Sequence, residues 1–308
     1  MRSLLFTLAL AACGAPARPV EAPAPPPPVQ APRPPSAEHG EVVVPLAGGA
    51  NAVWWDAASQ TLYLTDNNAD ALLQWTDAGG LSTVGTFPAS AAGVSLGGIV
   101  RRPDGTILVA SFGFGKEGTL FAMSGDKTGA ALGGLDPVRR RVGLAQDDQA
   151  ALYTAYFVGS KGEKPIGGVA TVTVRGKTAS ETEIAGSSTR AGFQKLVGLV
   201  ATPTALYVAD QAQKTIFKIA VPGYQVSTLA TVPRLDLLIQ LPGGDLLTGG
   251  GGEISRITPA GVVTTLSGAQ LEQVRGLAFD PAGKRLFIID HSATPGRPDQ
   301  LHIRPFAG

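Results

Sequence analysis

The stretch Ala205–Asp210 reads ALYVAD, and related phrases recur along the chain. The other five copies are TLYLTD (61–66), TILVAS (106–111), ALYTAY (151–156), DLLTG (245–249) and RLFIID (285–290). Their last residues lie 45, 45, 54, 39 and 41 positions apart. A period of roughly 40 to 50 residues is typical of the four-stranded blades of a β-propeller. The spacing therefore predicts six such units.

Each phrase has strand-like neighbours on both sides. A small residue and two apolar residues come about a dozen positions earlier in most copies, as in Gly198-Leu199-Val200. A third apolar stretch follows, such as residues 215–219, and then a fourth, such as residues 226–229. Turn sequences such as Pro281-Ala282-Gly283 separate the first two stretches and favour tight hairpins. Short strands at this even spacing indicate an all-β chain.

The two ends of the repeat region complement each other. The last unit stops after its third strand, residues 300–306, and residues 41–46 form a spare strand before the first unit. Pairing these strands would protect both sheet edges. We therefore predict an all-β domain over residues 41–308, a single six-bladed β-propeller closed by the N-terminal strand. An open repeat array or a pair of sandwiches is the alternative, because sandwiches also use short strands with regular turns.

The amino-acid composition excludes a helical bundle and a nucleic-acid-binding role. The 308 residues include 40 glycines and 24 prolines, which disfavours a helical bundle. The 25 basic and 24 acidic residues give a net charge of +1. A protein with so little positive charge does not hold a phosphate backbone by general electrostatics. We therefore expect no nucleic-acid partner.

The first residues have the layout of a secretory signal peptide. Arg2 is followed by an apolar segment, residues 4–12, which is too short to span a bilayer. Residues 10–14 read LAACG and resemble the lipobox of bacterial lipoproteins, in which the cysteine carries the lipid. The resemblance implies a signal peptide over residues 1–12 and a lipid anchor on Cys13. A plain signal peptide with a chance cysteine is the alternative.

The segment after the cysteine predicts a spacer. Ten of the prolines fall within residues 15–40, and such a segment favours an extended polyproline II conformation. We expect residues 13–40 to hold the propeller away from a membrane. Gly14 is not the aspartate associated with inner-membrane retention, so the expected location is the bacterial cell envelope, on the outer membrane facing the periplasm. Cys13 is the only cysteine, so the propeller has no disulfide.

The first unit also resembles a known family. Residues 51–63, NAVWWDAASQTLY, resemble the opening blade of senescence-marker-protein/gluconolactonase propellers, and ALYVAD is similar to NHL repeats. The resemblance implies a divalent metal such as Ca²⁺ at the channel mouth, held by a glutamate of the opening motif and by later asparagine and aspartate residues. Asn51 stands where that glutamate would be, and Val142 and Val197 replace the asparagines. Asn51 and Asp236 remain as metal candidates, a poor set of ligands for a hard cation.

Antiparallel strands bring the starts of the first strands and the second-to-third-strand loops to one face of a propeller. We expect ligand binding at this channel mouth, and the candidate residues are Asn51, Tyr156, Asp210, Asp236 and Arg275. Asp236 and Arg275 come from adjacent units and are expected to form an ion pair.

Other residues could contribute at the same face. Arg139-Arg140-Arg141, with Lys161 and Lys164, either favours anions at the mouth or forms a solvated charged loop. Asp66–Asp70 favours an Asx turn rather than a calcium loop, because alanine replaces the required glycine. The chain has three histidines, and His291 is the one expected near the mouth.

Two functions follow. The residues favour a non-enzymatic, lipid-anchored binding propeller whose partner is a protein, a glycan or another cell-envelope ligand. The alternative is a gluconolactonase-like lactone or ester hydrolase with a degenerate metal site, in which His291 and Asp236 are catalytic. Metal dependence would separate the two.

Overall fold

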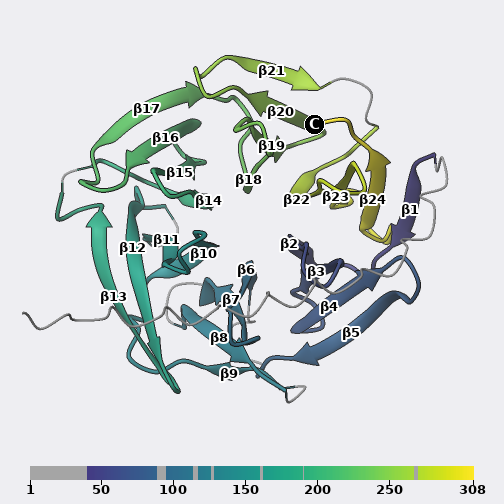
Figure 1. The fold of residues 1–308 in the computed structure, drawn as a ribbon, viewed down its shortest axis with the longest axis horizontal. Helices are drawn as coiled ribbons and strands as arrows, with labels where there is room; N and C mark the ends of the chain where they lie inside the picture. Colours follow the sequence, from purple (N-terminus) through teal and green to yellow (C-terminus); the bar gives the residue numbers. More distant parts are fainter. Residues whose placement is uncertain are drawn as a thin grey trace, which may run out of the picture. The chain divides into compact units, whose positions relative to one another are not determined.

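Six four-stranded antiparallel sheets surround a central channel in the computed structural model (Figure 1). The structure describes residues 40–88, 95–113, 117–125, 128–159, 162–189, 191–266 and 270–308. All regular secondary structure in these ranges is β-strand, which confirms the predicted six-bladed β-propeller. The predicted signal peptide, Cys13 and the predicted spacer up to residue 39 lie outside the described residues. No helix within the described ranges is long and apolar enough to cross a membrane.

The first five sheets follow one another along the chain. Their strands are β2 (Ala50–Asp56), β3 (Thr61–Asp66), β4 (Ala71–Thr76) and β5 (Gly80–Thr86); β6 (Leu96–Arg101), β7 (Ile107–Ser111), β8 (Thr119–Met123) and β9 (Ala130–Ala131); β10 (Arg140–Gln146), β11 (Leu152–Val158), β12 (Ile166–Arg175) and β13 (Thr178–Ala185); β14 (Leu196–Ala201), β15 (Ala205–Asp210), β16 (Thr215–Ala220) and β17 (Val226–Thr231); β18 (Leu238–Gln240), β19 (Leu246–Gly250), β20 (Glu253–Ile257) and β21 (Val263–Leu266). The first strand of each sheet lies nearest the channel (Figure 1).

The sixth sheet joins the two ends of the repeat region. It contains β22 (Val274–Asp280), β23 (Arg285–Asp290), β24 (Gln300–Pro305) and β1 (Val42–Pro45), with β1 at its outer edge. Val42 pairs with Ile303, and Pro45 pairs with Gln300. The N-terminal strand thus supplies the missing fourth strand, as predicted.

Burial explains why the second-strand phrase recurs. Every residue of β3 and of β15 is buried, because the second strand lies inside its sheet and both of its faces pack against neighbours. One apolar cluster joins the third and fourth sheets and includes Val169, Leu206 and Ile219, each 0% exposed. The hydrophobic core therefore lies between neighbouring sheets.

The small residue that precedes each phrase has a steric cause. A Cβ atom on Gly198 would lie 2.9 Å from the backbone oxygen of Asp236, in the loop that leads into β18 of the next sheet. A Cβ atom on Gly276 would lie 2.7 Å from the backbone oxygen of Asn51. These distances are too short for a side chain, so glycine allows neighbouring inner strands to approach closely and sets the width of the channel.

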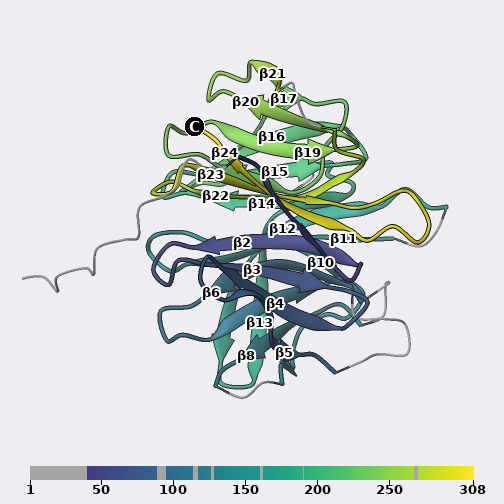
Figure 2. The same ribbon diagram turned by 90° about the vertical axis from the view of Figure 1, so that its right-hand side faces the viewer.

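The antiparallel strand directions place the connecting loops on two opposite faces of the propeller. Figure 2 shows the connecting loops gathered at opposite ends of the strands. The starts of the inner strands and the loops after the second strands share one face, which holds the channel mouth. The hairpins between first and second strands, such as residues 56–61, share the other face.

Candidate functional site at the channel mouth

Asp236 and Arg275 form the predicted ion pair between the fifth and sixth sheets. Arg275 Nη1 lies 3.5 Å from Asp236 Oδ2, and the two side chains are 35% and 16% exposed. The backbone N–H of Asp236 donates to Thr248 Oγ1 at 3.3 Å. The loop that leads into β18 therefore fixes the carboxylate beside the guanidinium.

The surroundings of Asp236 favour its neutral form. Burial raises the pKa of this carboxyl to about 6, although the positive charges of Arg275 and Lys195 act in the opposite direction. Desolvation penalises the charged form of an acid, which is why burial dominates here. A carboxyl group with this pKa exchanges protons near neutral pH, as a general base requires.

Lys195 is a mouth residue that the sequence analysis did not single out. It lies just before β14, and its Nζ donates to Gln211 Oε1 at 2.6 Å. The ammonium stands 5.9 Å from the ring centroid of Phe157, and the guanidinium of Arg140 stands 5.6 Å from the same centroid. One aromatic ring thus carries two cationic neighbours near Asp236. The available sequence signal was the position of Lys195, directly before an inner strand.

Asp210 is buried structural support for the loop that carries Lys195. Its carboxylate is 0% exposed and accepts hydrogen bonds from the backbone N–H groups of Gln194 and Lys195, at 2.7 and 3.1 Å. The backbone N–H groups of Ala212 and Gln213 also donate to it, each at 3.1 Å. Burial leaves this carboxylate inaccessible to a ligand, so Asp210 does not fit the ligand-binding role expected from the sequence.

The same device recurs in other sheets. Asp290, at the end of β23, accepts from the backbone N–H groups of Glu272 and Gln273. Asp66, at the end of β3, accepts from those of Asn68 and Ala69, which confirms the predicted Asx turn. The aspartate that closes these phrases therefore anchors loops at the mouth face.

Tyr156 is also buried, at 4% exposure. Its hydroxyl donates to Glu183 Oε2, and burial together with this bond raises the pKa of the phenol. The guanidinium of Arg139 covers the ring, 4.3 Å from its centroid. The side chain therefore stabilises the third sheet, and its hydroxyl is not open to a ligand at the mouth.

The three consecutive arginines, residues 139–141, have different roles. Arg141 is 0% exposed, with Nε 2.6 Å from Glu181 Oε1 and Nη2 2.7 Å from Glu181 Oε2. Arg139 also contacts Glu181, at 3.2 Å. These two arginines stabilise the third sheet, and only Arg140 lies against Phe157. Of the two lysines considered with the triplet, Lys164 is exposed and Lys161 lies outside the described residues.

The mouth does not fit a divalent metal. Asn51 donates from Nδ2 to the backbone oxygen of Leu96 at 2.7 Å, and Asp236 already faces Arg275. Val142 and Val197 are buried apolar residues that offer no side-chain oxygen. No three His, Cys, Asp or Glu side chains converge on a metal position within the described ranges. A guanidinium is therefore the positive partner of Asp236.

His291 forms a separate pair on the same face. Its Nδ1 lies 2.9 Å from Asp299 Oδ1, and its side chain is 38% exposed. The backbone N–H of His291 donates to the backbone oxygen of Gln273, beside the start of β22. His302 lies elsewhere, in β24, where its Nδ1 contacts Glu41 Oε1 at 2.5 Å.

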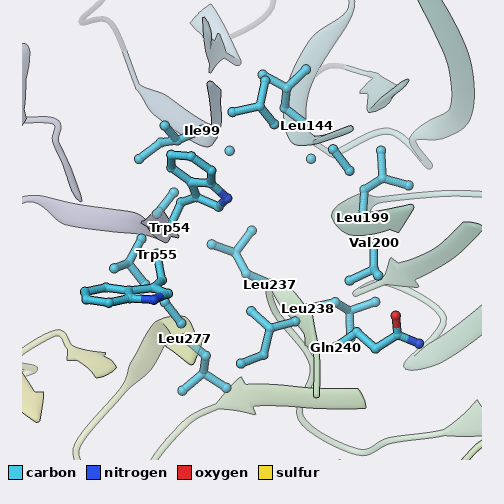
Figure 3. A pocket seen from close by; sticks show the side chains of 18 of the residues that line it. Trp54, Trp55, Ile99, Leu144, Leu199, Val200, Leu237, Leu238, Gln240 and Leu277 are labelled. Carbon is cyan, nitrogen blue, oxygen red and sulfur yellow. The ribbon is translucent and has the colours of Figure 1, made fainter. Parts of the chain in front are cut away.

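The other end of the channel holds a cavity of about 380 Å³, shown in Figure 3. The inner strands of all six sheets line it, and Trp54 and Trp55 contribute the largest side chains. We expected ligand binding at the mouth face alone, so this cavity was not predicted. The paired tryptophans near the end of a first strand were the available signal.

Several solved structures share the fold of this chain. No family model and no curated protein matches the chain. Among solved structures, a gluconolactonase from Xanthomonas campestris is 16% identical and gives a TM-score of 0.65, with 85% of this chain and 89% of that one covered. The calcium-binding protein regucalcin from Agrobacterium tumefaciens is 14% identical with a TM-score of 0.65, covering 86% and 95%. Virginiamycin B lyase from Staphylococcus aureus is 12% identical with a TM-score of 0.57, covering 85% and 98%.

These likenesses agree with the architecture seen here. The chain is a six-bladed β-propeller, and its structural neighbours include gluconolactonase-like enzymes. At such low identity the likeness establishes the fold alone, because one fold carries many activities.

Proposed function

We propose that the protein is a hydrolase of small lactones or esters that acts at the channel mouth without a metal, with Asp236 as general base. The observation that carries the proposal is the buried carboxyl of Asp236, whose pKa is raised to about 6 beside the guanidinium of Arg275. Strongly perturbed titratable groups in a channel are typical of catalytic sites. Gluconolactonase-like enzymes among the structural neighbours support the reaction class.

The geometry suggests a two-step reaction. Asp236 accepts a proton from a water molecule as the water oxygen bonds to the substrate carbonyl carbon. Arg275 donates hydrogen bonds to the oxyanion that forms, the role that positive donors play in acyl transfer. The tetrahedral intermediate then collapses, the carbon–oxygen bond to the leaving alkoxide breaks, and the alkoxide takes the proton from Asp236. The products are the free acid and an alcohol, joined in one molecule when the substrate is a lactone.

His291 has a secondary place in this proposal. Its ring is paired with Asp299, 2.9 Å away, so the pair is oriented on the mouth face. A histidine held by a carboxylate can shuttle protons between a site and solvent. In this hydrolase Asp236 is the general base, and His291 transfers protons between the channel mouth and solvent.

A binding propeller is the second candidate. The apolar residues Val142 and Val197 at the mouth and the poor fit to a metal favour it. Its ligand would be a protein, glycan or other envelope component, presented to a propeller tethered by a lipid on Cys13 to the periplasmic side of the outer membrane. The anchor and location belong to either function and rest on the sequence alone.

The test is hydrolysis by the full chain. Glucono-δ-lactone, γ-butyrolactone and p-nitrophenyl acetate are assayed with EDTA present, using the wild type and Asp236→Asn. The matched control is Asp104→Asn, a 53% exposed aspartate on the opposite face. Turnover lost only in Asp236→Asn supports the hydrolase. No turnover by the wild type, or equal turnover by Asp236→Asn, would leave the binding propeller as the better account.

A further inference from the structure

The cavity opposite the mouth has the dimensions of a small-molecule site. Its volume is about 380 Å³, within the range of roughly 300 to 1,000 Å³ that is typical of ligand pockets. The last residues of inner strands, among them Arg101, Gln146 and Gln240, reach its walls. The cavity therefore lies toward the hairpin face, at the end of the channel away from Asn51.

The side chains that line the cavity are largely apolar, while backbone groups of the inner strands supply polar atoms. Ile99, Leu144, Leu199 and Leu277 surround the cavity, and the side chain of Leu237 points into it (Figure 3). No carboxylate occurs among the described residues that line it. The charged lining residue, Arg101, has its Nη1 2.8 Å from Asp56 Oδ2. An uncharged ligand suits these walls, because an ion would lose its hydration without a free partner.

Two indole rings contribute to the cavity lining from opposite faces of β2, Trp54 on the side of the second sheet and Trp55 on the side of the sixth. Trp54 stacks on Tyr63, with centroids 5.9 Å apart and an interplanar angle of 24°. Trp55 stacks on Phe287 at 5.2 Å and 21°. Both tryptophans remain only half-buried, although the rings behind them hold them in place. Pre-oriented aromatic faces favour a planar aromatic ligand, because stacking then costs little side-chain entropy.

Trp54 also provides a directed hydrogen-bond donor. Figure 3 shows its indole nitrogen turned toward the cavity. Among the described residues no protein group accepts a hydrogen bond from this N–H, and the indole is only partly buried. Partly buried indole N–H groups usually find a partner. A ligand oxygen in the cavity would fill that place.

We propose that this cavity binds a small uncharged aromatic molecule that carries a carbonyl or similar hydrogen-bond acceptor, with its ring against an exposed indole edge or face of the lining and its acceptor on the N–H of Trp54. The site is separate from the proposed hydrolase site. Asp236 faces Arg275 at the mouth, whereas the next residue, Leu237, faces the cavity. Neither site depends on the other.

The experiment titrates the full chain with prodan, a neutral aminonaphthalene ketone whose emission moves to shorter wavelength in apolar surroundings. Two of the three tryptophans line the cavity, so binding should also quench tryptophan emission. Trp54→Phe keeps the ring but removes the donor, and we expect its dissociation constant to rise about three- to tenfold. Ala201→Phe adds a ring at the cavity lining and should abolish binding.

The control is Tyr153→Phe, which removes a hydroxyl from a buried aromatic ring outside the cavity and should leave prodan affinity unchanged. Melting curves check that each variant is folded, and Asp236→Asn should bind prodan like the wild type. Saturable binding that follows this pattern supports the proposal. Absence of saturable binding, or equal affinity in Ala201→Phe and the wild type, would overturn it.

Discussion

Arg275 Nη1 lies 3.5 Å from Asp236 Oδ2, and this contact joins the fifth and sixth sheets at the channel mouth. The carboxyl is buried enough for its pKa to rise to about 6 in spite of the nearby guanidinium. The pair thus combines a poised proton acceptor with a fixed positive charge. The proposed hydrolysis needs both groups.

Loss of the guanidinium should shift the titration of Asp236. Because Arg275 lowers the pKa of this carboxyl, Arg275→Met should raise it above about 6. Arg275→Lys keeps a positive charge and should shift it less. Carbon-13 NMR titration of the aspartate carboxyl signals, assigned with Asp236→Asn, measures the change. An unaltered titration in Arg275→Met would show that the guanidinium does not act on Asp236.

Asp236→Asn should stabilise the protein at neutral pH. The pKa of Asp236 is about 6 in the folded state and near 3.8 in the unfolded chain, so the folded protein binds more protons between these values. Ionisation of Asp236 therefore lowers the free energy of unfolding as the pH rises from about 4 to 6. Above pH 6 this loss is complete and no longer changes with pH. The asparagine variant avoids a cost of up to about 3 kcal/mol.

Urea unfolding at two pH values checks this. We expect Asp236→Asn to have a higher free energy of unfolding than the wild type at neutral pH and a similar one near pH 4. A variant that is less stable than the wild type at neutral pH would contradict the raised pKa.

Strand β1 should be essential for ring closure. Deleting residues 1–45 removes β1 and leaves the edge of β24 unpaired. The deletion also removes the contacts of Glu41 with His302 and Arg304. We expect a lower melting temperature and concentration-dependent association, because an unpaired edge recruits another strand. Deleting residues 1–40 keeps β1 and is the control. Sedimentation velocity compares the two, and equal melting and mass would refute the closing role.

The ion pair of Arg141 and Glu181 should be costly to break. Glu181→Leu leaves the fully buried Arg141 without its carboxylate partner, so we expect a loss of about 3 to 5 kcal/mol in the free energy of unfolding. The double variant Arg141→Met with Glu181→Leu should recover much of this, because no uncompensated charge remains. Guanidinium unfolding measures all forms. A double variant no more stable than Glu181→Leu would argue against a charge effect.

The sequence predicts the architecture well for a physical reason. Each second strand is buried on both faces, so its apolar phrase stays visible in every repeat, as in β3 and β15. The glycine within an inner strand is also predictable, because a Cβ atom on Gly198 would clash with the chain that leads into the next sheet. The closing strand follows from one missing strand at the end of the last unit.

The site is harder to predict, because side-chain direction decides it. Asp210 and Asp236 are both mouth-face aspartates in the sequence, yet Asp210 is 0% exposed and binds backbone N–H groups. Arg141 likewise points into the third sheet, whereas its neighbour Arg140 lies over Phe157. The ion pair of Asp236 and Arg275 was predictable because adjacent sheets place corresponding residues together.

The most direct test of the hydrolase is the pH dependence of lactone hydrolysis by the full chain with EDTA present. We expect a rate that rises as the pH passes about 6 and then levels off, because Asp236 must be ionised to accept a proton. EDTA should not change this profile, and Asp236→Asn should abolish it. A rate that vanishes with EDTA and returns with Ca²⁺, or a profile that Asp236→Asn leaves intact, would show that Asp236 is not a metal-independent general base.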